Sequence, residues 1–312
     1  MGFSFASKLI AWQKKHGRHD LPWQGTRDPY AIWLAEIMLQ QTQVATVIPY
    51  YSRFLARFPD VAALASAPLD EVLRLWSGLG YYSRARNLHG AAQEVVTVHG
   101  GRFPRRFEQV ASLPGIGRST AAAICVFAYG ARHAILDGNV KRVLARYRGI
   151  KGYPGDKAVA DRLWQAAEKL LPRRGIEAYT QGLMDLGATV CSRGKPRCAE
   201  CPAHGDCIAV KRGWVPKLPG LRPRKPLPHR RTVMLVLTRA GEVLLEKRPV
   251  AGIWGGMWCL PEAAKKTDLE AYCLKRFGTH VTEVEKLETI AHGFTHFSLY
   301  ILRLRVKISA LV

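Results

Sequence analysis

The sequence predicts a mostly α-helical N-terminal domain, residues 1–212, followed by a smaller C-terminal α+β domain, residues 232–312. Three observations support this fold class. The N-terminal part alternates short breaks with segments whose apolar period is about 3.6 residues, and it shows no convincing strand pattern. Residues 213–231 are rich in proline, arginine and lysine, which is typical of an extended, positively charged linker. From Thr232 onward, β-rich runs flank one helical segment.

Local signals justify the individual elements in chain order. Asp28 and Pro29 are a typical N-cap and first helical residue for the segment DPYAIWLAEIMLQQT. The segments PLDEVLRLWSGLG and ASLPGIGRSTAAAICVFAYG both end in glycine, a frequent helix stop. In the second domain we expect a hairpin around Ala240 and Gly241, a helix in DLEAYCLKRFG and a half-buried strand in FTHFSLYILRLRV. Because the chain stops at Val312 directly after this strand, we expect the second domain to be incomplete.

The charge balance points to a polyanionic partner. The chain has 47 Lys+Arg against 24 Asp+Glu, a formal net charge of +23. Nucleic acid is the leading candidate, ahead of an anionic membrane surface or a merely basic solvated surface. The N-terminus is too polar for a signal peptide and no apolar run could span a bilayer, so we expect a cytoplasmic protein without a membrane partner.

Four of the seven cysteines are bunched with the spacing C-x6-C-x2-C-x5-C: Cys191, Cys198, Cys201 and Cys207. In a reducing compartment such thiols are metal ligands rather than disulfides. All four lie in one short loop, which favours one 4Fe–4S cluster over a structural zinc site or free thiols. The flanking Lys195, Arg197 and Lys211 could face a phosphate backbone.

A glycine-containing turn, LPGIG, lies between the predicted helix RFEQVASL and the next helix. Gly115 and Gly117 allow a sharp turn and a close approach of the backbone to a partner. The N-terminus of the following helix presents N–H groups that suit a phosphate. In a strongly basic chain this pattern favours a helix–hairpin–helix element that grips DNA over a plain helix–helix turn.

Two carboxylates form a candidate catalytic pair. Glu36 shares a helical face with Ile32, Trp33 and Leu39, and desolvation there would raise its pKa toward that of a general acid. Asp137 begins a basic helix, whose N-terminus would hold it ionised. The plain alternatives are a rim glutamate paired with an arginine and an N-cap aspartate. Together, a neutral acid and an ionised carboxylate can cleave a glycosidic bond through an oxocarbenium-like state.

These motifs resemble the endonuclease III superfamily of helix–hairpin–helix DNA glycosylases. Within it, EIMLQQTQVATVIPYY, LWSGLGYYSRARNLH, LPGIGRSTA and MDLGA are similar to motifs of the MutY family of adenine DNA glycosylases. The resemblance covers nearly the whole chain. It implies a monomeric, nucleoid-associated bacterial enzyme of base excision repair. Such an enzyme flips adenine out of A:8-oxoguanine or A:G mispairs in double-stranded DNA and hydrolyses its N-glycosidic bond.

The resemblance also assigns roles to residues. Glu36 would protonate adenine N7 and handle the water, Asp137 would stabilise an oxocarbenium ion or a covalent sugar intermediate, and Asn139 would orient the site. Ser119 stands where the lyase branch of the superfamily has a Schiff-base lysine, which implies a monofunctional enzyme with weak strand scission. The implied adenine pocket contains Leu21, Trp23, Gln24, Gln181 and Ser119. The implied DNA contacts are Gln41, Tyr81, Gly115, Gly117 and Arg118, of which Gln41 and Tyr81 would enter the duplex; their plain alternatives are a helix-surface amide and a core tyrosine.

The second domain, with GIWGGMWCLPE, resembles the Nudix-like C-terminal domain of the same family. No run similar to G-x5-E-x7-R-E-x2-E-E follows, so we expect no pyrophosphohydrolase activity. Phe294, Thr295 and His296 stand where the family has its Phe-Ser-His loop for 8-oxoguanine, and threonine keeps the hydroxyl.

Two other functions stay open on the sequence. One is excision of thymine or an oxidised pyrimidine on the same scaffold, against which Gln24, Gln181 and Ser119 argue. The other is a non-catalytic iron–sulfur DNA-binding protein.

Overall fold

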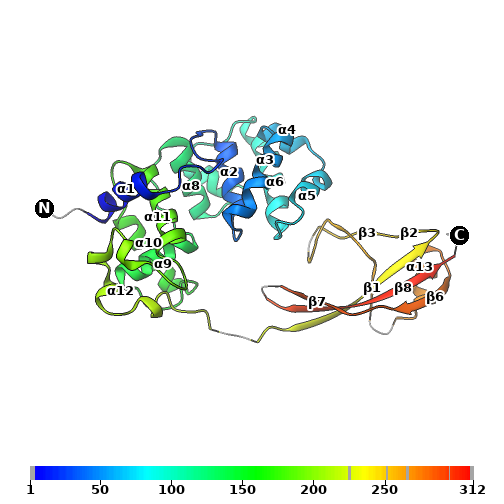
Figure 1. Cartoon of the computed structure of the whole chain (residues 1–312). Helices are drawn as coiled ribbons and strands as arrows, with labels where there is room; N and C mark the ends of the chain where they lie inside the picture. Colours follow the sequence, from blue (N-terminus) through cyan, green and yellow to red (C-terminus); the bar gives the residue numbers. More distant parts are fainter. Residues whose placement is uncertain (1–3, 224–225, 251, 265–266, 295, 310–312) are drawn as a thin grey trace. The chain divides into compact units, whose positions relative to one another are not determined.

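The structure is a computed structural model that describes residues 4–223, 226–250, 252–264, 267–294 and 296–309. The chain divides into two compact units, Met1–Arg222 and Pro223–Val312 (Figure 1). The first is helical and the second is built mainly on a sheet, which confirms the predicted fold class.

The first unit consists of helices joined by short turns, and its described residues contain no strand. Its α-helices are α1 (Phe5–His16), α2 (Pro29–Leu39), α3 (Val44–Arg57), α4 (Val61–Ser66), α5 (Leu69–Trp76), α6 (Ser83–His99), α7 (Phe107–Ser112), α8 (Arg118–Tyr129), α9 (Gly138–Arg148), α10 (Lys157–Lys169), α11 (Ile176–Asp185) and α12 (Ile208–Lys211). A π-helical turn, Leu186–Val190, continues α11, and 3-10 turns span Cys198–Glu200, His204–Asp206 and Val215–Lys217. Among these described residues, no helix combines the length and apolarity that a membrane crossing requires.

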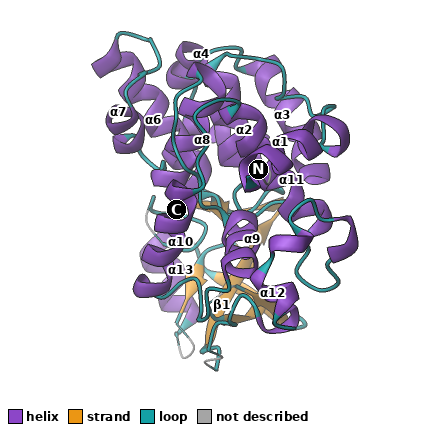
Figure 2. Cartoon of the chain, turned by 90° about the vertical axis from the view of Figure 1, so that its left-hand side faces the viewer, coloured by secondary structure: helices purple, strands orange, loops and turns teal. Residues whose placement is uncertain are grey.

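Two hydrophobic cores meet at α8, which lies beside α2 (Figures 1 and 2). On one side, Ile124 joins the core around Trp33 and Trp76. On the other side, Ala122 joins the core around Leu144, which lies on α9. Each large buried apolar side chain contributes about 1.5–3 kcal/mol by leaving water. Because α2 and α9 belong to different cores that share α8, residues on these two helices can face a common space.

Helix ends follow the local signals closely. The Asp28 carboxylate accepts a hydrogen bond from the Tyr30 N–H at the start of α2, which confirms the predicted N-cap. α8 ends at Gly130, whose backbone is left-handed at φ 66°, as predicted for a glycine stop. α5 ends earlier than its glycines, with Ser77 as the C-cap.

Much of the predicted linker packs on the helical unit. Leu218 is buried there, and its carbonyl accepts a hydrogen bond of 2.8 Å from Arg146 Nε. The Gly220 N–H donates to the Gly152 carbonyl over 3.0 Å. The first unit therefore extends to Arg222, and the connection is shorter than the predicted 213–231, because Leu218 and Gly220 bind to the helical unit.

The second unit is built on a mixed sheet with strand order β2-β1-β8-β6, in which β5 pairs with β1 and β7 with β8. The elements are β1 (His229–Arg239), β2 (Glu242–Val243), β3 (Glu246–Lys247), β4 (Trp258–Cys259), β5 (Glu262–Ala263), α13 (Leu269–Phe277), β6 (Val281–Lys286), β7 (Ile290–Gly293) and β8 (Ser298–Ile308). The predicted hairpin around Ala240 and Gly241, the helix and the long last strand are confirmed. The sequence did not predict that β1 and β8 pair in parallel.

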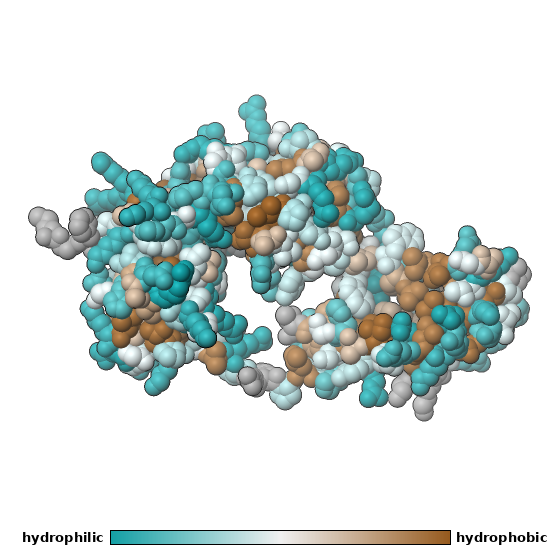
Figure 3. Space-filling view, viewed as in Figure 1, coloured by the Kyte–Doolittle hydropathy of each residue, from teal (hydrophilic) through white to brown (hydrophobic). Residues whose placement is uncertain are grey.

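The second unit has the smaller core and exposes more apolar surface. Its main buried cluster centres on Leu235, Leu237 and Val306. Hydrophobic side chains gather on the face of this unit that Figure 3 shows. Among the large apolar side chains of this unit, those of Val250 and Trp258 are 63% and 58% exposed.

Candidate active site

Two adjoining cavities in the helical unit share Glu36. The first has a volume of about 540 Å3, and the predicted adenine-pocket residues on its wall are Leu21, Trp23, Gln24 and Gln181. The second, of about 660 Å3, contains Ser119, Asp137 and Asn139 in its wall. Both volumes lie in the range of small-ligand sites. The structure thus brings the predicted catalytic residues and the predicted pocket residues together around one glutamate.

Glu36 lies in the middle of α2, on the helical turn that also carries the buried Ile32 and Trp33. Burial, helped by the negative charge of Asp137, raises the pKa of Glu36 to about 8. The carboxyl is therefore mostly protonated at neutral pH. A protonated carboxyl at the wall of a ligand-sized cavity can act as a general acid.

Asp137 is the N-cap of α9, and its Oδ1 accepts a hydrogen bond of 2.7 Å from the Val140 N–H. The N–H groups of Val140 and Asn139 and the charges of Arg142 and Lys141 all act to lower its pKa, as the helix N-terminus predicts. Burial acts the other way and is the larger effect, so the pKa of Asp137 is raised. The expectation of a simply ionised carboxylate therefore needs correction, because the sequence could not show how deeply this residue is buried.

The hydrogen bonds of Ser119 and Asn139 fix both side chains at the cavity wall. Ser119 Oγ accepts from the Leu136 N–H over 2.9 Å. Asn139 Oδ1 accepts from Arg142 Nη2 over 2.8 Å. The same guanidinium donates through Nε to the Cys191 carbonyl over 2.7 Å, which joins the wall of the second cavity to the cysteine loop.

Sequence reasoning missed two residues that orient the pocket amides. Asp185 is fully buried and accepts from Gln181 Nε2 over 2.9 Å and from Arg18 Nε over 2.7 Å. Gln24 donates to the Arg18 carbonyl over 2.9 Å and accepts from the Leu21 N–H over 3.1 Å. The motif MDLGA contains Asp185, and its i,i+4 spacing from Gln181 in α11 is a signal that could have identified this pair, whereas Arg18 is distant in the sequence. Gln181, held in this way by Asp185, forms part of the wall of the first cavity.

The predicted hairpin lies between α7 and α8, and its two glycines differ. Gly115 has φ +77°, and a Cβ there would lie 2.8 Å from Asn87 Cβ, so this position requires glycine. Gly117 has an ordinary φ of −89° and room for a Cβ. The guanidinium carbon of Arg118, a predicted DNA contact, lies 3.9 Å from the Trp164 ring centroid, and the same side chain forms an ion pair with Glu168.

Gln41 and Tyr81 lie at the tips of two exposed turns. Both have left-handed backbones, with φ 57° and 48°, which costs roughly 1–2 kcal/mol for a residue with a side chain. Tyr81 is 43% exposed, so the alternative of a core tyrosine is wrong. The turns place an amide and a phenol where an incoming duplex could meet them.

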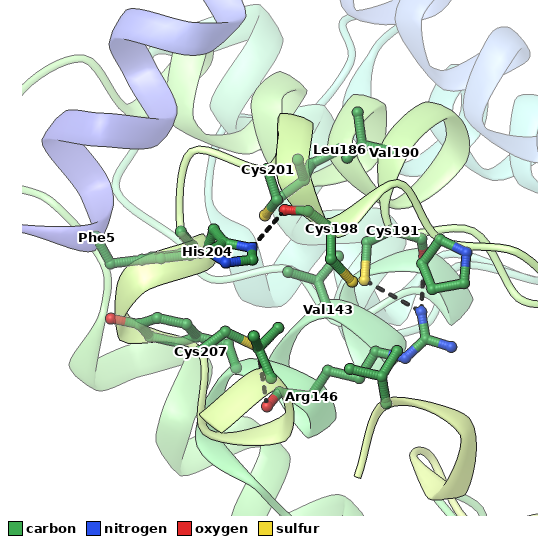
Figure 4. Close-up of a pocket in the computed structure, with 15 residues that line it drawn as sticks. Phe5, Val143, Arg146, Leu186, Val190, Cys191, Cys198, Cys201, His204 and Cys207 are labelled. Atoms are coloured by element: carbon green, nitrogen blue, oxygen red, sulfur yellow. Dashed lines mark hydrogen bonds between the residues drawn. The ribbon is translucent and has the colours of Figure 1, made fainter. Parts of the chain in front are cut away.

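The four bunched cysteines line one cavity, and their side chains point into it (Figure 4). The remaining wall is mainly apolar and includes Phe5 and Val143. Burial raises the pKa of Cys201 to about 11 and also raises that of Cys207. In the described parts of the chain, no three His, Cys, Asp or Glu side chains converge as ligands of one metal ion. Four thiols around one cavity are a donor set that fits an iron–sulfur cluster.

The predicted 8-oxoguanine loop follows β7. Phe294 stacks on Phe297 with ring centroids 4.5 Å apart. It also meets the His292 ring edge-on, with ring centroids 4.6 Å apart. His296 is exposed, and Thr295 lies outside the described residues. The loop thus presents an aromatic platform on the second unit.

Comparison with known proteins identifies the family. The pattern of the HhH-GPD superfamily base excision DNA repair protein matches residues 34–169, and that of the NUDIX domain matches residues 232–311. The adenine DNA glycosylase of Buchnera aphidicola subsp. Acyrthosiphon pisum is 39% identical over 300 residues, which cover 96% of this chain and 85% of that protein. The chain belongs to the adenine DNA glycosylase family.

A second relative agrees with this family assignment, and a solved structure agrees with the helical fold. The mouse adenine DNA glycosylase is 44% identical over 229 residues, which cover 70% of this chain and 44% of the mouse protein. The solved structure of a thermostable thymine-DNA glycosylase superimposes with a TM-score of 0.61 at 32% identity, covering 67% of this chain and 95% of that one. The resemblance seen in the sequence is confirmed.

Proposed function

We propose that this member of the family is a monofunctional DNA glycosylase that excises adenine mispaired with 8-oxoguanine or guanine in double-stranded DNA. The observation that carries the proposal is Glu36, with its raised pKa, at the junction of two cavities and beside Asp137. The base has to leave the helical stack to reach this junction.

Glu36 donates its proton to adenine N7, so that the breaking N-glycosidic bond leaves its electron pair on a neutral base. Asp137 supplies the carboxylate of the pair, because N–H groups and cations stabilise its ionised form, and its negative charge raises the pKa of Glu36. That carboxylate then stabilises the positive charge that develops on the sugar. The ionised Glu36 takes a proton from the water that adds to the sugar carbon.

The first cavity selects the base. Gln24 and Gln181 offer fixed amide groups to the edge of adenine, while Leu21 and Trp23 contact its faces. A site built to hydrogen-bond one base edge leaves buried polar groups unpaired with another base, which is the physical basis of discrimination.

Ser119 explains the absence of an efficient lyase step in this proposal. A hydroxyl cannot form the imine that a lysine forms, and Ser119 Oγ already accepts the Leu136 N–H. Release of the base then leaves an abasic site on an intact strand.

We further propose that Cys191, Cys198, Cys201 and Cys207 bind one 4Fe–4S cluster. When bound, it cross-links the loop and keeps the four sulfurs deprotonated. Arg146 supports the thiolate form, because its Nη1 lies 3.4 Å from Cys191 Sγ. In the second unit, Phe294, Thr295 and His296 are proposed to recognise 8-oxoguanine, with Phe294 and its aromatic neighbours as the stacking surface.

Single-turnover base release from four duplexes tests the function: A opposite 8-oxoguanine, A opposite guanine, A opposite thymine, and T opposite guanine, each with and without alkali. We expect release from the first two alone, with strand breaks mainly after alkali. Release from the thymine–guanine duplex instead would favour pyrimidine excision. If cluster-replete protein binds these duplexes but releases no base, the chain is a binding protein, and breaks without alkali would contradict a monofunctional enzyme.

A further inference from the structure

One buried guanidinium lies between the two exposed turns that carry Gln41 and Tyr81. Arg84, the second residue of α6, is only 8% exposed. Its Nη1 donates to the carbonyls of Ile37, Met38 and Gln40 over 3.0, 2.8 and 2.6 Å. All three carbonyls belong to the C-terminal end of α2 and the residue that follows it.

The second nitrogen reaches both turns. Arg84 Nη2 donates to Thr42 Oγ1 over 3.1 Å, and to the carbonyls of Leu79 and Gly80 over 3.1 and 3.2 Å. Its contacts therefore flank Gln41 on both sides and end at the residue before Tyr81. The guanidinium carbon also lies 5.5 Å from the Tyr81 ring centroid.

The chemistry of this contact is specific to arginine. The last carbonyls of a helix have no partner within the helix, and a cation at that end satisfies them. A planar guanidinium has N–H donors on several nitrogens and can bind two separate segments at once, whereas the donors of a lysine ammonium all lie on one nitrogen. Gln41 and Tyr81 also hold left-handed backbones, which persist only where the surroundings fix them.

From these contacts we propose that Arg84 is a positioning residue that fixes Gln41 and Tyr81 relative to each other, so that the two turns enter the duplex as one rigid wedge. This inference rests on the proposed glycosylase function. It assigns Arg84 to the opening of the duplex and not to bond cleavage. Replacing Arg84 should therefore slow base release most on duplexes whose target base pair is hardest to open.

The test compares single-turnover base release from two duplexes with A opposite 8-oxoguanine. In one duplex the flanking pairs are matched, and in the other they are mismatched, so that less unstacking is needed. We expect Arg84→Met to slow release roughly 100-fold on the matched duplex and less than about 10-fold on the weakened one. Arg84→Lys should show the same selective pattern with a smaller loss.

A matched control is Arg132→Met, which also removes a guanidinium that donates to backbone carbonyls, those of Leu171 and Pro172. It should change release from the two duplexes by the same factor. If Arg84→Met loses its melting transition, Arg84→Lys decides by the same comparison. Equal losses on both duplexes, or no loss on the matched one, would overturn the inference. A wild type that releases adenine from neither duplex would instead overturn the proposed function.

A double-mutant cycle separates this role from general loosening of the fold. In a background carrying Gln41→Ala and Tyr81→Ala, the wedge is already gone. Arg84→Lys should then slow release from the matched duplex by less than about threefold further. A full additional loss in that background would show that Arg84 acts through something other than the wedge, and would also overturn the inference.

Discussion

The cavity junction around Glu36 and the cavity of the four cysteines lie in the same helical unit and use burial in opposite ways. At Glu36, burial retains a proton that the proposed reaction uses. At Cys201 and Cys207, burial also favours the protonated form, and binding of the proposed cluster would have to remove those protons. The comparison shows that one physical effect, desolvation, supports the proposed acid at the first site and opposes the thiolate form that the proposed cluster needs at the second.

The largest effect should come from removing the proton at the first site. Glu36→Gln keeps the size of the side chain but has no acidic proton, so we expect single-turnover adenine release to fall by about 10²- to 10⁴-fold. Duplex binding should persist. Glu94→Gln on α6 is the matched control and should release adenine at the wild-type rate. A Glu36→Gln protein with near-normal release would end the assignment of general acid.

Loss of the proposed cluster from the cysteine cavity should mainly lower the melting temperature of the protein. Cys201→Ser removes one proposed cluster ligand, and we expect the visible absorbance of the cluster to disappear and the melting temperature to fall by about 10 °C or more. Cys125→Ser, a buried thiol outside the cysteine cavity, should keep the absorbance. If Cys201→Ser kept a full complement of iron, the proposed ligand set would be wrong.

The pH dependence sharpens the contrast at the first site. With the pKa of Glu36 at about 8, the release rate should fall about tenfold per pH unit above pH 8. The folded chain binds this proton up to about pH 8, and the unfolded chain only up to about its ordinary 4.5. Stability should therefore decline as pH rises between these values, and Glu36→Gln should lack that decline. A wild-type rate that rises through pH 8 would contradict the acid role.

The smallest expected effect lies at the hairpin, which depends on neither cavity. Gly115→Ala places a Cβ against Asn87 at a left-handed position, so the turn must shift. We expect affinity for duplex DNA to weaken about tenfold, measured by titration at fixed salt. Gly90→Ala, inside α6 with open space around it, is the control and should leave affinity unchanged. Equal affinities for both variants would show that the hairpin does not grip the backbone.

The sequence by itself determined what depends on neighbours along the chain. Interactions within a few residues produce the Asp28 cap, the glycine stop at Gly130 and the left-handed turn at Gly115, and the structure contains all three. The short spacing of the four cysteines likewise predicted that they line one cavity. The apolar face of α2 likewise marked Glu36, because helical periodicity is local.

Tertiary structure alone decided the rest. Arg84 binds the turn of Gln41, Asp185 binds Arg18, and residues 213–222 pack on the helical unit, all through contacts between residues that are far apart in the sequence. The balance at Asp137 is of the same kind, since its helix N-terminus is a local feature but its burial depends on what packs around it. An apolar helical face can indicate desolvation, as at Glu36, but the burial of a residue at a helix end and long-range hydrogen bonds have no signature in a short segment, because they arise only when distant parts of the chain pack together.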